Sequence, residues 1–217
     1  MYINPEIVSV RRTKEQALET REALLNAALR IFSENGLEAP RLEDIAQEAG
    51  VTRGALYWHF KNKEDLLISL LDFYEERLLQ KVVEFVSDPR HQDLSLSERG
   101  SVWIASLAEI LIRERDLFRI RNLHSIRFPE QISRLRQETN AQIMKRTYEF
   151  FTPVMHEIKR GRRERALKCV IMTIDYTLVY NIVFASIDDP VTSGISVKIL
   201  TDELRQMFDA YLGLEAP

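Results

Sequence analysis

Residues 42–60 read LEDIAQEAGVTRGALYWHF, and this stretch decides the fold of the N-terminal part of the chain. The apolar residues of its first half recur at helical spacing: Leu42, Ile45, Ala46 and Ala49. Gly50 ends this short helix, and Thr52 is a good N-cap for a second helix that is over by Phe60. Two short helices joined by so tight a turn predict a helix-turn-helix, whose second helix enters a major groove of DNA.

The second of these helices has side chains suited to DNA. From Val51 to Lys63 there are three cations, one histidine and no acid. Leu56 and Phe60 are four residues apart and face inward, which leaves the other side of the helix for a partner. The Arg53 guanidinium suits guanine O6 and N7, and Tyr57, His59 and Lys63 are of types that bind phosphate oxygens. The alternative is that Tyr57, Trp58 and His59 only pack a small aromatic core.

The rest of the chain repeats the helical spacing, and no stretch alternates with period two. We therefore predict an all-α protein of nine helices. They cover about residues 14–35, 42–49, 52–60, 62–86, 95–112, 116–126, 129–159, 163–187 and 196–212. Pro153 is expected to kink the seventh helix, and Gly161 to end it.

Several stretches together resemble the N-terminal domain of the TetR (tetracycline-repressor) family. They are VTRGALYWHFKNKEDL at 51–66, ETREALLNAA at 19–28 and FSENG at 32–36. Within the first, TRGALYWHF is most similar to the branch that represses multidrug efflux pumps. The resemblance covers about residues 20–66, so it identifies the DNA-binding module and says little about the remainder.

The resemblance implies roles at matching positions. Thr52, Tyr57, His59 and Lys63 would hold phosphate, while Arg53 and Ala55 would face bases. The chain departs from the family where Pro40 and Arg41 replace a helix-capping Ser or Thr, and Arg41 is expected to make the phosphate contact instead. The predicted DNA-binding set is Arg41, Thr52, Arg53, Gly54, Ala55, Tyr57, Trp58, His59 and Lys63.

The resemblance also implies two domains. Residues 1–60 would form the helix-turn-helix domain, with 1–13 as a flexible arm, and residues 61–217 a helical regulatory and dimerisation domain. The basic residues Arg11, Arg12 and Lys14 suit either an arm that reaches DNA or a solvated tail. The last two helices would pair with those of a second copy.

A ligand pocket is expected among the helices of the regulatory domain. Its candidate lining residues are aromatic or polar: Trp103, Phe118, His124, Tyr148, Phe151, Asp175, Tyr176, Tyr180, Asn181 and Phe184. Core packing explains most of them individually. Asp175 and Asn181 differ because a buried carboxylate or amide needs a partner, and a carboxylate among aromatic rings suits lipophilic cations. The basic run 159–168 is interpreted as a solvated loop.

Composition excludes several classes of protein. The net charge is −3, so any signal for DNA binding lies in the local pattern of charges. The single cysteine, Cys169, excludes a disulfide within the chain or a thiolate cluster and fits the cytoplasm. The apolar run from Cys169 to Ile187 contains Asp175 and Asn181, so we interpret it as a buried helix and expect no membrane contact. No metal or cofactor is expected, and no catalytic motif indicates an enzyme.

These observations predict a homodimeric repressor that a small hydrophobic or cationic ligand releases from a palindromic operator. The regulated gene would encode an efflux or transport protein. An activator, or a regulator of the nucleoid or of cell division, built on the same fold is the alternative that the sequence leaves open.

Overall fold

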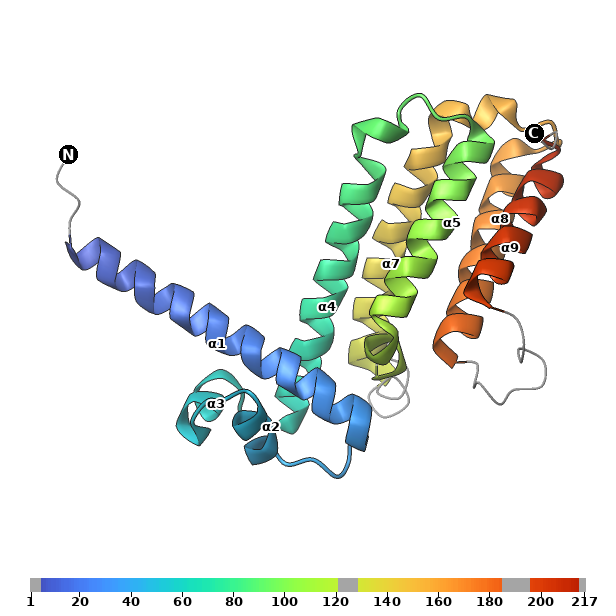
Figure 1. The fold of residues 1–217 in the computed structure, drawn as a ribbon. Helices are drawn as coiled ribbons and strands as arrows, with labels where there is room; N and C mark the ends of the chain where they lie inside the picture. Colours follow the sequence, from blue (N-terminus) through green and yellow to red (C-terminus); the bar gives the residue numbers. More distant parts are fainter. Residues whose placement is uncertain (1–4, 121–128, 185–195, 215–217) are drawn as a thin grey trace. The chain divides into compact units, whose positions relative to one another are not determined.

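The computed structural model describes residues 5–120, 129–184 and 196–214. Within these ranges every regular element is a helix, which confirms the predicted all-α class (Figure 1). Helical residues 115–120, between α5 and α7, bring the described α-helices to nine. The others are α1 (Pro5–Asn35), α2 (Leu42–Glu48), α3 (Arg53–His59), α4 (Lys63–Val86), α5 (Leu96–Arg113), α7 (Pro129–Phe151), α8 (Arg163–Val179) and α9 (Val197–Leu212).

The chain forms two compact units, Met1–Tyr74 (unit 1) and Glu75–Pro217 (unit 2). This division falls inside α4, later than the boundary that we place at residue 60. The difference arises because the first turns of α4 belong to the core of unit 1. Leu66 and Leu70 are fully buried there, and the Tyr74 hydroxyl donates to Asn26 Oδ1 of α1 at 3.1 Å.

The first helix begins earlier than predicted. Residues 5–13, expected to belong to a flexible arm, continue the helical backbone of α1 back to Pro5. Proline is well tolerated at the first position of a helix, where its missing N–H has no helical partner anyway. At the other end, Gly36 takes the left-handed conformation with φ of 73°, as a glycine that ends a helix commonly does.

Unit 2 is a helical bundle in which α5, α8 and α9 pack on one another (Figure 1). An aromatic group lies at its centre: the Phe151 ring is 5.8 Å from that of Trp103 and 5.7 Å from that of Phe208, centroid to centroid. Helix α5 approaches α9 closely at Gly100. A Cβ added there would lie 2.5 Å from Phe208 Cε1. The absence of a side chain at residue 100 therefore sets the spacing of these two helices.

The ends of α7 and α8 differ from the prediction. Pro153 does not kink one long helix. Instead α7 ends at Phe151 and a 3₁₀ helix, Thr152–Glu157, follows, since proline cannot donate to the α-helical ladder. The left-handed residue before α8 is Arg162 (φ 59°), not Gly161. Beyond Val179 the helix continues as one π-helical turn, Tyr180–Phe184.

Candidate nucleic-acid interface and ligand cavity

Helices α2 and α3 form the predicted helix-turn-helix. Their inward residues Leu42, Ile45, Leu56 and Phe60 are buried. Gly50 supplies the left-handed residue of the turn, with φ of 68°. The Thr52 hydroxyl caps α3 by accepting from the Ala55 N–H at 3.2 Å. The buried residues, the glycine of the turn and the threonine cap together determine which side of α3 faces solvent.

The outer face of α3 presents most of the predicted DNA-binding residues. Thr52, Arg53, Gly54, Tyr57 and Trp58 are exposed, while Ala55 and His59 are half-buried. Trp58 is 75% exposed, so it does not belong to a miniature aromatic core. The exposed side chains of Trp58 and Arg53 on this short helix form a surface that can contact base edges and phosphates.

Glu43 of α2 is a neighbour of this face that sequence reasoning missed. Its carboxylate pairs with Arg53 Nη2 at 3.1 Å and accepts from the Tyr57 hydroxyl at 3.3 Å. The Arg53 guanidinium also lies 5.4 Å from the centre of the Tyr57 ring. The sequence does show that residue 43 lies in the helix that precedes the recognition helix. An acid, however, is not a residue that one looks for near DNA.

Lys63 and Arg41 are placed differently from one another. Lys63 Nζ donates to the backbone carbonyls of Glu38 and Pro40, each at 2.8 Å, and lies 5.8 Å from the Phe32 ring. Burial lowers the pKa of this ammonium group. Lys63 therefore fastens the loop between α1 and α2 in the DNA-free protein. Arg41 is exposed, and its backbone N–H donates to Asp44 Oδ2 at 2.8 Å, the bond that the third helical residue of a capping box makes back to the N-cap residue.

His59 lies half-buried at the end of α3, with its ring 4.6 Å from that of Trp58 in an edge-to-face arrangement. Burial, and then the positive charge of Arg21, lower its pKa below 6.5. The unfolded chain then binds more protons than the folded one as the pH falls below 6.5. The stability that the neutral imidazole contributes is therefore present above this pH and is lost as the pH falls through the folded-state pKa.

We expect His59→Gln to remove this acid sensitivity. The stability of the wild-type protein, measured by urea unfolding between about pH 7.5 and 5, should fall more steeply than that of the variant. Comparing the two proteins cancels the titration of the carboxylates, which both contain. Parallel curves would show that His59 titrates alike in the folded and unfolded states.

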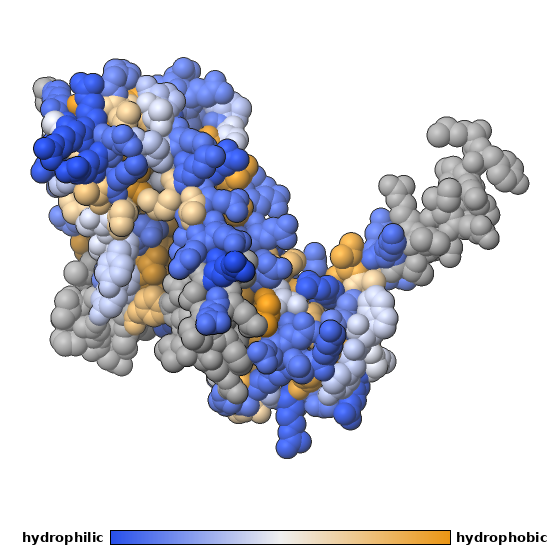
Figure 2. All heavy atoms as spheres, turned by 180° about the vertical axis from the view of Figure 1, so that it is seen from behind, coloured by the Kyte–Doolittle hydropathy of each residue, from blue (hydrophilic) through white to orange (hydrophobic). Residues whose placement is uncertain are grey.

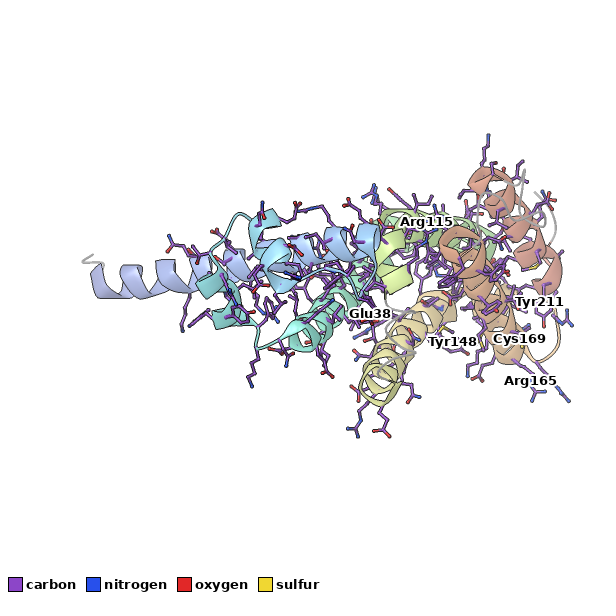
Figure 3. All side chains as sticks on the ribbon, turned by 90° about the horizontal axis from the view of Figure 1, so that it is seen from below. Glu38, Arg115, Tyr148, Arg165, Cys169 and Tyr211 are labelled. Atoms are coloured by element: carbon purple, nitrogen blue, oxygen red, sulfur yellow. The ribbon has the colours of Figure 1, made fainter. Side chains whose placement is uncertain are left out.

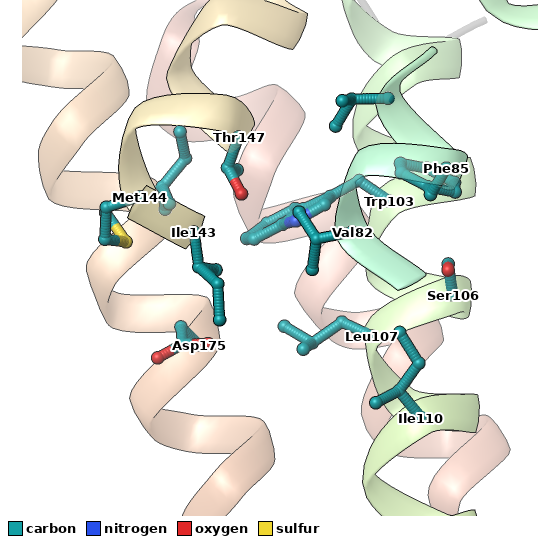
Figure 4. A pocket seen from close by; sticks show the side chains of 12 residues that line it. Val82, Phe85, Trp103, Ser106, Leu107, Ile110, Ile143, Met144, Thr147 and Asp175 are labelled. Atoms are coloured by element: carbon teal, nitrogen blue, oxygen red, sulfur yellow. The ribbon is translucent and has the colours of Figure 1, made fainter. Parts of the chain in front are cut away.

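A mostly apolar cavity lies inside unit 2, between α4, α5, α7 and α8 (Figure 4). Its volume is about 40 Å³, which is room for a few water molecules. The Trp103 indole crosses it between Thr147 and Val82 (Figure 4). Besides the indole N–H, its polar groups are the Ser106 and Thr147 hydroxyls and the Asp175 carboxylate. The lining residues are Val82, Phe85, Val86, Trp103, Ser106, Leu107, Ile110, Ile143, Met144, Thr147, Ile171 and Asp175.

Of the predicted ligand residues that the structure describes, two line this cavity, Trp103 and Asp175. Phe118 and Phe151 are buried in the core, and Tyr148 packs against it. The Asn181 amide has a partner within its own helix, since its Nδ2 donates to the Thr177 carbonyl one turn earlier at 2.8 Å. His124 lies outside the described residues. The other candidates are exposed and do not line the cavity: Tyr176, Tyr180 and Phe184.

These exposed residues belong to an apolar face that runs along α8 and the π-helical turn after it. Met172 is 62% exposed and Tyr176 73%, and the Tyr176 and Tyr180 rings stack with centroids 6.5 Å apart. Cys169 continues the face toward Arg165 (Figure 3). By length and composition Arg163–Phe184 is able to cross a membrane. Its opposite side, however, packs in the bundle core through Leu167, Val170 and Ile174 among others.

The sequence around the helix-turn-helix matches known regulators. Residues 24–70 match the family described as bacterial regulatory proteins, tetR family. The chain is 45% identical over 83 residues to the HTH-type transcriptional regulator AcrR of Shigella flexneri, which covers 36% of this chain and 39% of that protein. It is 55% identical over 67 residues to TtgR of Pseudomonas putida, covering 31% and 32%. The chain thus spans less than two fifths of the length of these relatives.

Solved structures share the fold over nearly the whole chain. A protein of Mesorhizobium loti described as a TetR-family transcriptional regulator has a TM-score of 0.71 at 19% identity, covering 91% of this chain and 96% of its own. FadR of Bacillus subtilis, in complex with stearoyl-CoA, has a TM-score of 0.63 at 21% identity, covering 86% and 96%. Residues 24–70 therefore have the sequence of the tetR family of bacterial regulatory proteins, and the fold of the described chain agrees with this match.

Proposed function

We propose that this protein is a cytoplasmic, homodimeric transcriptional repressor that binds a palindromic operator. The exposed face of α3, with Arg53, Tyr57 and Trp58 and no acid of its own, is the observation that carries the proposal. Its relatives over this segment are named as transcriptional regulators, and one of them as the probable acrEF/envCD operon repressor of Escherichia coli. We infer that the regulated gene likewise encodes an efflux or transport protein.

The dimer would form through α8 and α9. Both helices have apolar side chains that unit 2 does not cover: Met172, Tyr176, Tyr180, Phe184 and, on α9, Ile199. Orange and pale atoms reach the surface of unit 2 among the blue ones in Figure 2. A two-fold axis beside α8 would cover such a face with its own copy. The two recognition helices would then enter successive major grooves, about 34–36 Å apart.

The ligand would occupy the cavity of unit 2 and act through α4. This helix runs without interruption from Lys63 in the DNA-binding unit to Val82, Phe85 and Val86 in the cavity wall. The lining suits a small, mainly hydrophobic molecule, and Asp175 would favour one that is cationic, but the cavity of about 40 Å³ would have to widen to admit it. Binding would release DNA only to the extent that the ligand prefers the cavity of the DNA-free state.

The proposal is tested by selecting duplex DNA from a random pool with the purified wild-type protein, then measuring affinities by fluorescence anisotropy. We expect one palindromic sequence to emerge. Arg53→Ala should weaken its binding about tenfold or more, because a bidentate contact to guanine is lost. Arg90→Ala is the matched control, since it removes an exposed arginine of unit 2 that lies on neither α8 nor α9, and it should have little effect. If the pool yields no preferred sequence, the protein is not an operator-binding repressor.

A further inference from the structure

Glu43 brings a negative charge to the surface that would meet DNA, which is itself polyanionic. It lies in the first turn of α2, where the helix dipole stabilises a negative charge. The neighbouring Asp44 is the residue that bonds back to the N-cap, accepting from the Arg41 N–H at 2.8 Å. Capping therefore does not explain Glu43, whose carboxylate is engaged with α3 instead.

The contacts of Glu43 contribute little to folding stability. The side chains of the Arg53–Glu43 pair are 71% and 41% exposed, and ion pairs so open to solvent are screened by water and salt. The carboxylate oxygen that pairs with Arg53 at 3.1 Å is also the acceptor of the Tyr57 hydroxyl at 3.3 Å. One oxygen atom thus restrains two side chains that we expect to face DNA.

This restraint has opposite consequences for cognate and other DNA. A free arginine side chain has many rotamers and can swing to any nearby phosphate, which gives affinity without selectivity. Arg53 pairs with Glu43 through Nη2, and its guanidinium lies over the Tyr57 ring. These two contacts restrict the Arg53 side chain to one orientation along α3 before DNA binds. A side chain ordered before binding loses less entropy when it meets the base that suits it.

We propose that Glu43 is a specificity-determining positioning residue of the DNA-binding surface. It would hold Arg53 and Tyr57 in the orientation used on the operator and lower the affinity for all other sequences by repelling phosphates. This inference rests on the proposed function, because it requires that α3 binds DNA.

The test compares Glu43→Gln with Glu48→Gln in the full-length protein. Both acids lie on α2 and both pair with an arginine, but the partner of Glu48 is Arg30 of α1, at 2.9 Å, rather than a residue of α3. The two variants therefore change the net charge equally. The probes are the duplex that wild type selects from a random pool and a scrambled duplex of the same composition, each measured over a range of salt concentrations.

We expect Glu43→Gln to bind the scrambled duplex about three- to tenfold more tightly and to lose selectivity by a similar factor. Its plot of log affinity against log salt should steepen by about one, since Arg53 gains a phosphate contact. Glu48→Gln should change selectivity less than about twofold. Glu43→Asp, which keeps the charge, should restore most of the selectivity. Urea unfolding should be nearly the same for all variants.

Two results would overturn the inference while leaving the proposed function intact. One is an equal effect of Glu43→Gln and Glu48→Gln, which would reduce Glu43 to a general surface charge. The other is a changed base preference at one operator position with unchanged binding to scrambled DNA, which would mean that Glu43 itself reads a base. If wild type selects no duplex at all, the proposed function fails and the inference fails with it.

Discussion

We expect the wild-type protein to sediment as the proposed dimer, and a variant with both Met172→Glu and Tyr176→Glu to sediment as a monomer at the same concentration. The two side chains are 62% and 73% exposed in the single chain, so the substitutions leave its core intact. In a two-fold interface each new carboxylate occurs twice, and the four charges would be brought together away from water. We expect self-association to weaken by at least about a hundredfold, measured by sedimentation equilibrium.

The same variant should lose at least about a hundredfold in operator affinity, because a monomer engages one half-site and forfeits the gain from linked binding. Ile112→Glu is the control, since Ile112 is 50% exposed on α5 and lies on neither α8 nor α9. It should dimerise and bind DNA as wild type does. A double variant that still sediments as a dimer would place the interface elsewhere on the molecule.

The helix-turn-helix was the part of the fold that the sequence predicted best, because short-range rules determine it. A glycine for the left-handed turn, a threonine cap and two inward residues four apart are all visible within residues 42–60. The structure has Gly50, Thr52, Leu56 and Phe60 in those positions. Each of these requirements involves residues a few positions apart, so no knowledge of the tertiary fold was needed.

Contacts between distant residues could not be predicted in the same way. Lys63 was expected to hold phosphate, yet its ammonium group donates to carbonyls 25 and 23 residues earlier in the chain. The contact of Glu43 with Tyr57 spans 14 residues and two helices. Sequence spacing describes one helix at a time, whereas these contacts depend on how one helix crosses or follows another.

The candidate cavity was harder still, because α8 is apolar on both sides. Ile171 lines the cavity and Leu167 the core, whereas Met172 and Tyr176 on the same helix are exposed. Hydrophobic periodicity separates a buried side from a solvated one, and it fails where the second side is apolar as well. For the same reason aromatic residues alone do not identify the lining of this cavity, and Tyr176, Tyr180 and Phe184 lie outside it.

The last prediction concerns the close approach of α5 and α9. Gly100→Val should destabilise unit 2 by about 3 kcal/mol, near the upper end of the cost of overfilling a well-packed core. A Cβ at this position would lie 2.5 Å from Phe208 Cε1 and 2.7 Å from Cδ1, and the Phe208 side chain is fully buried. A β-branched side chain adds two further methyl groups and gains little in helix propensity over glycine. Urea unfolding followed by circular dichroism measures the loss.

Gly161→Ala is the matched control, because a Cβ at that glycine meets nothing within 4 Å, and it should change stability by less than about 0.5 kcal/mol. A double-mutant cycle identifies the cause. If the clash with the ring is responsible, Gly100→Ala should cost less in a protein that also carries Phe208→Leu, because the smaller side chain leaves space for the methyl group. Strict additivity of the two substitutions would show instead that the added methyl group and the Phe208 ring do not interact. The close packing at Gly100 would then not be what fixes their spacing.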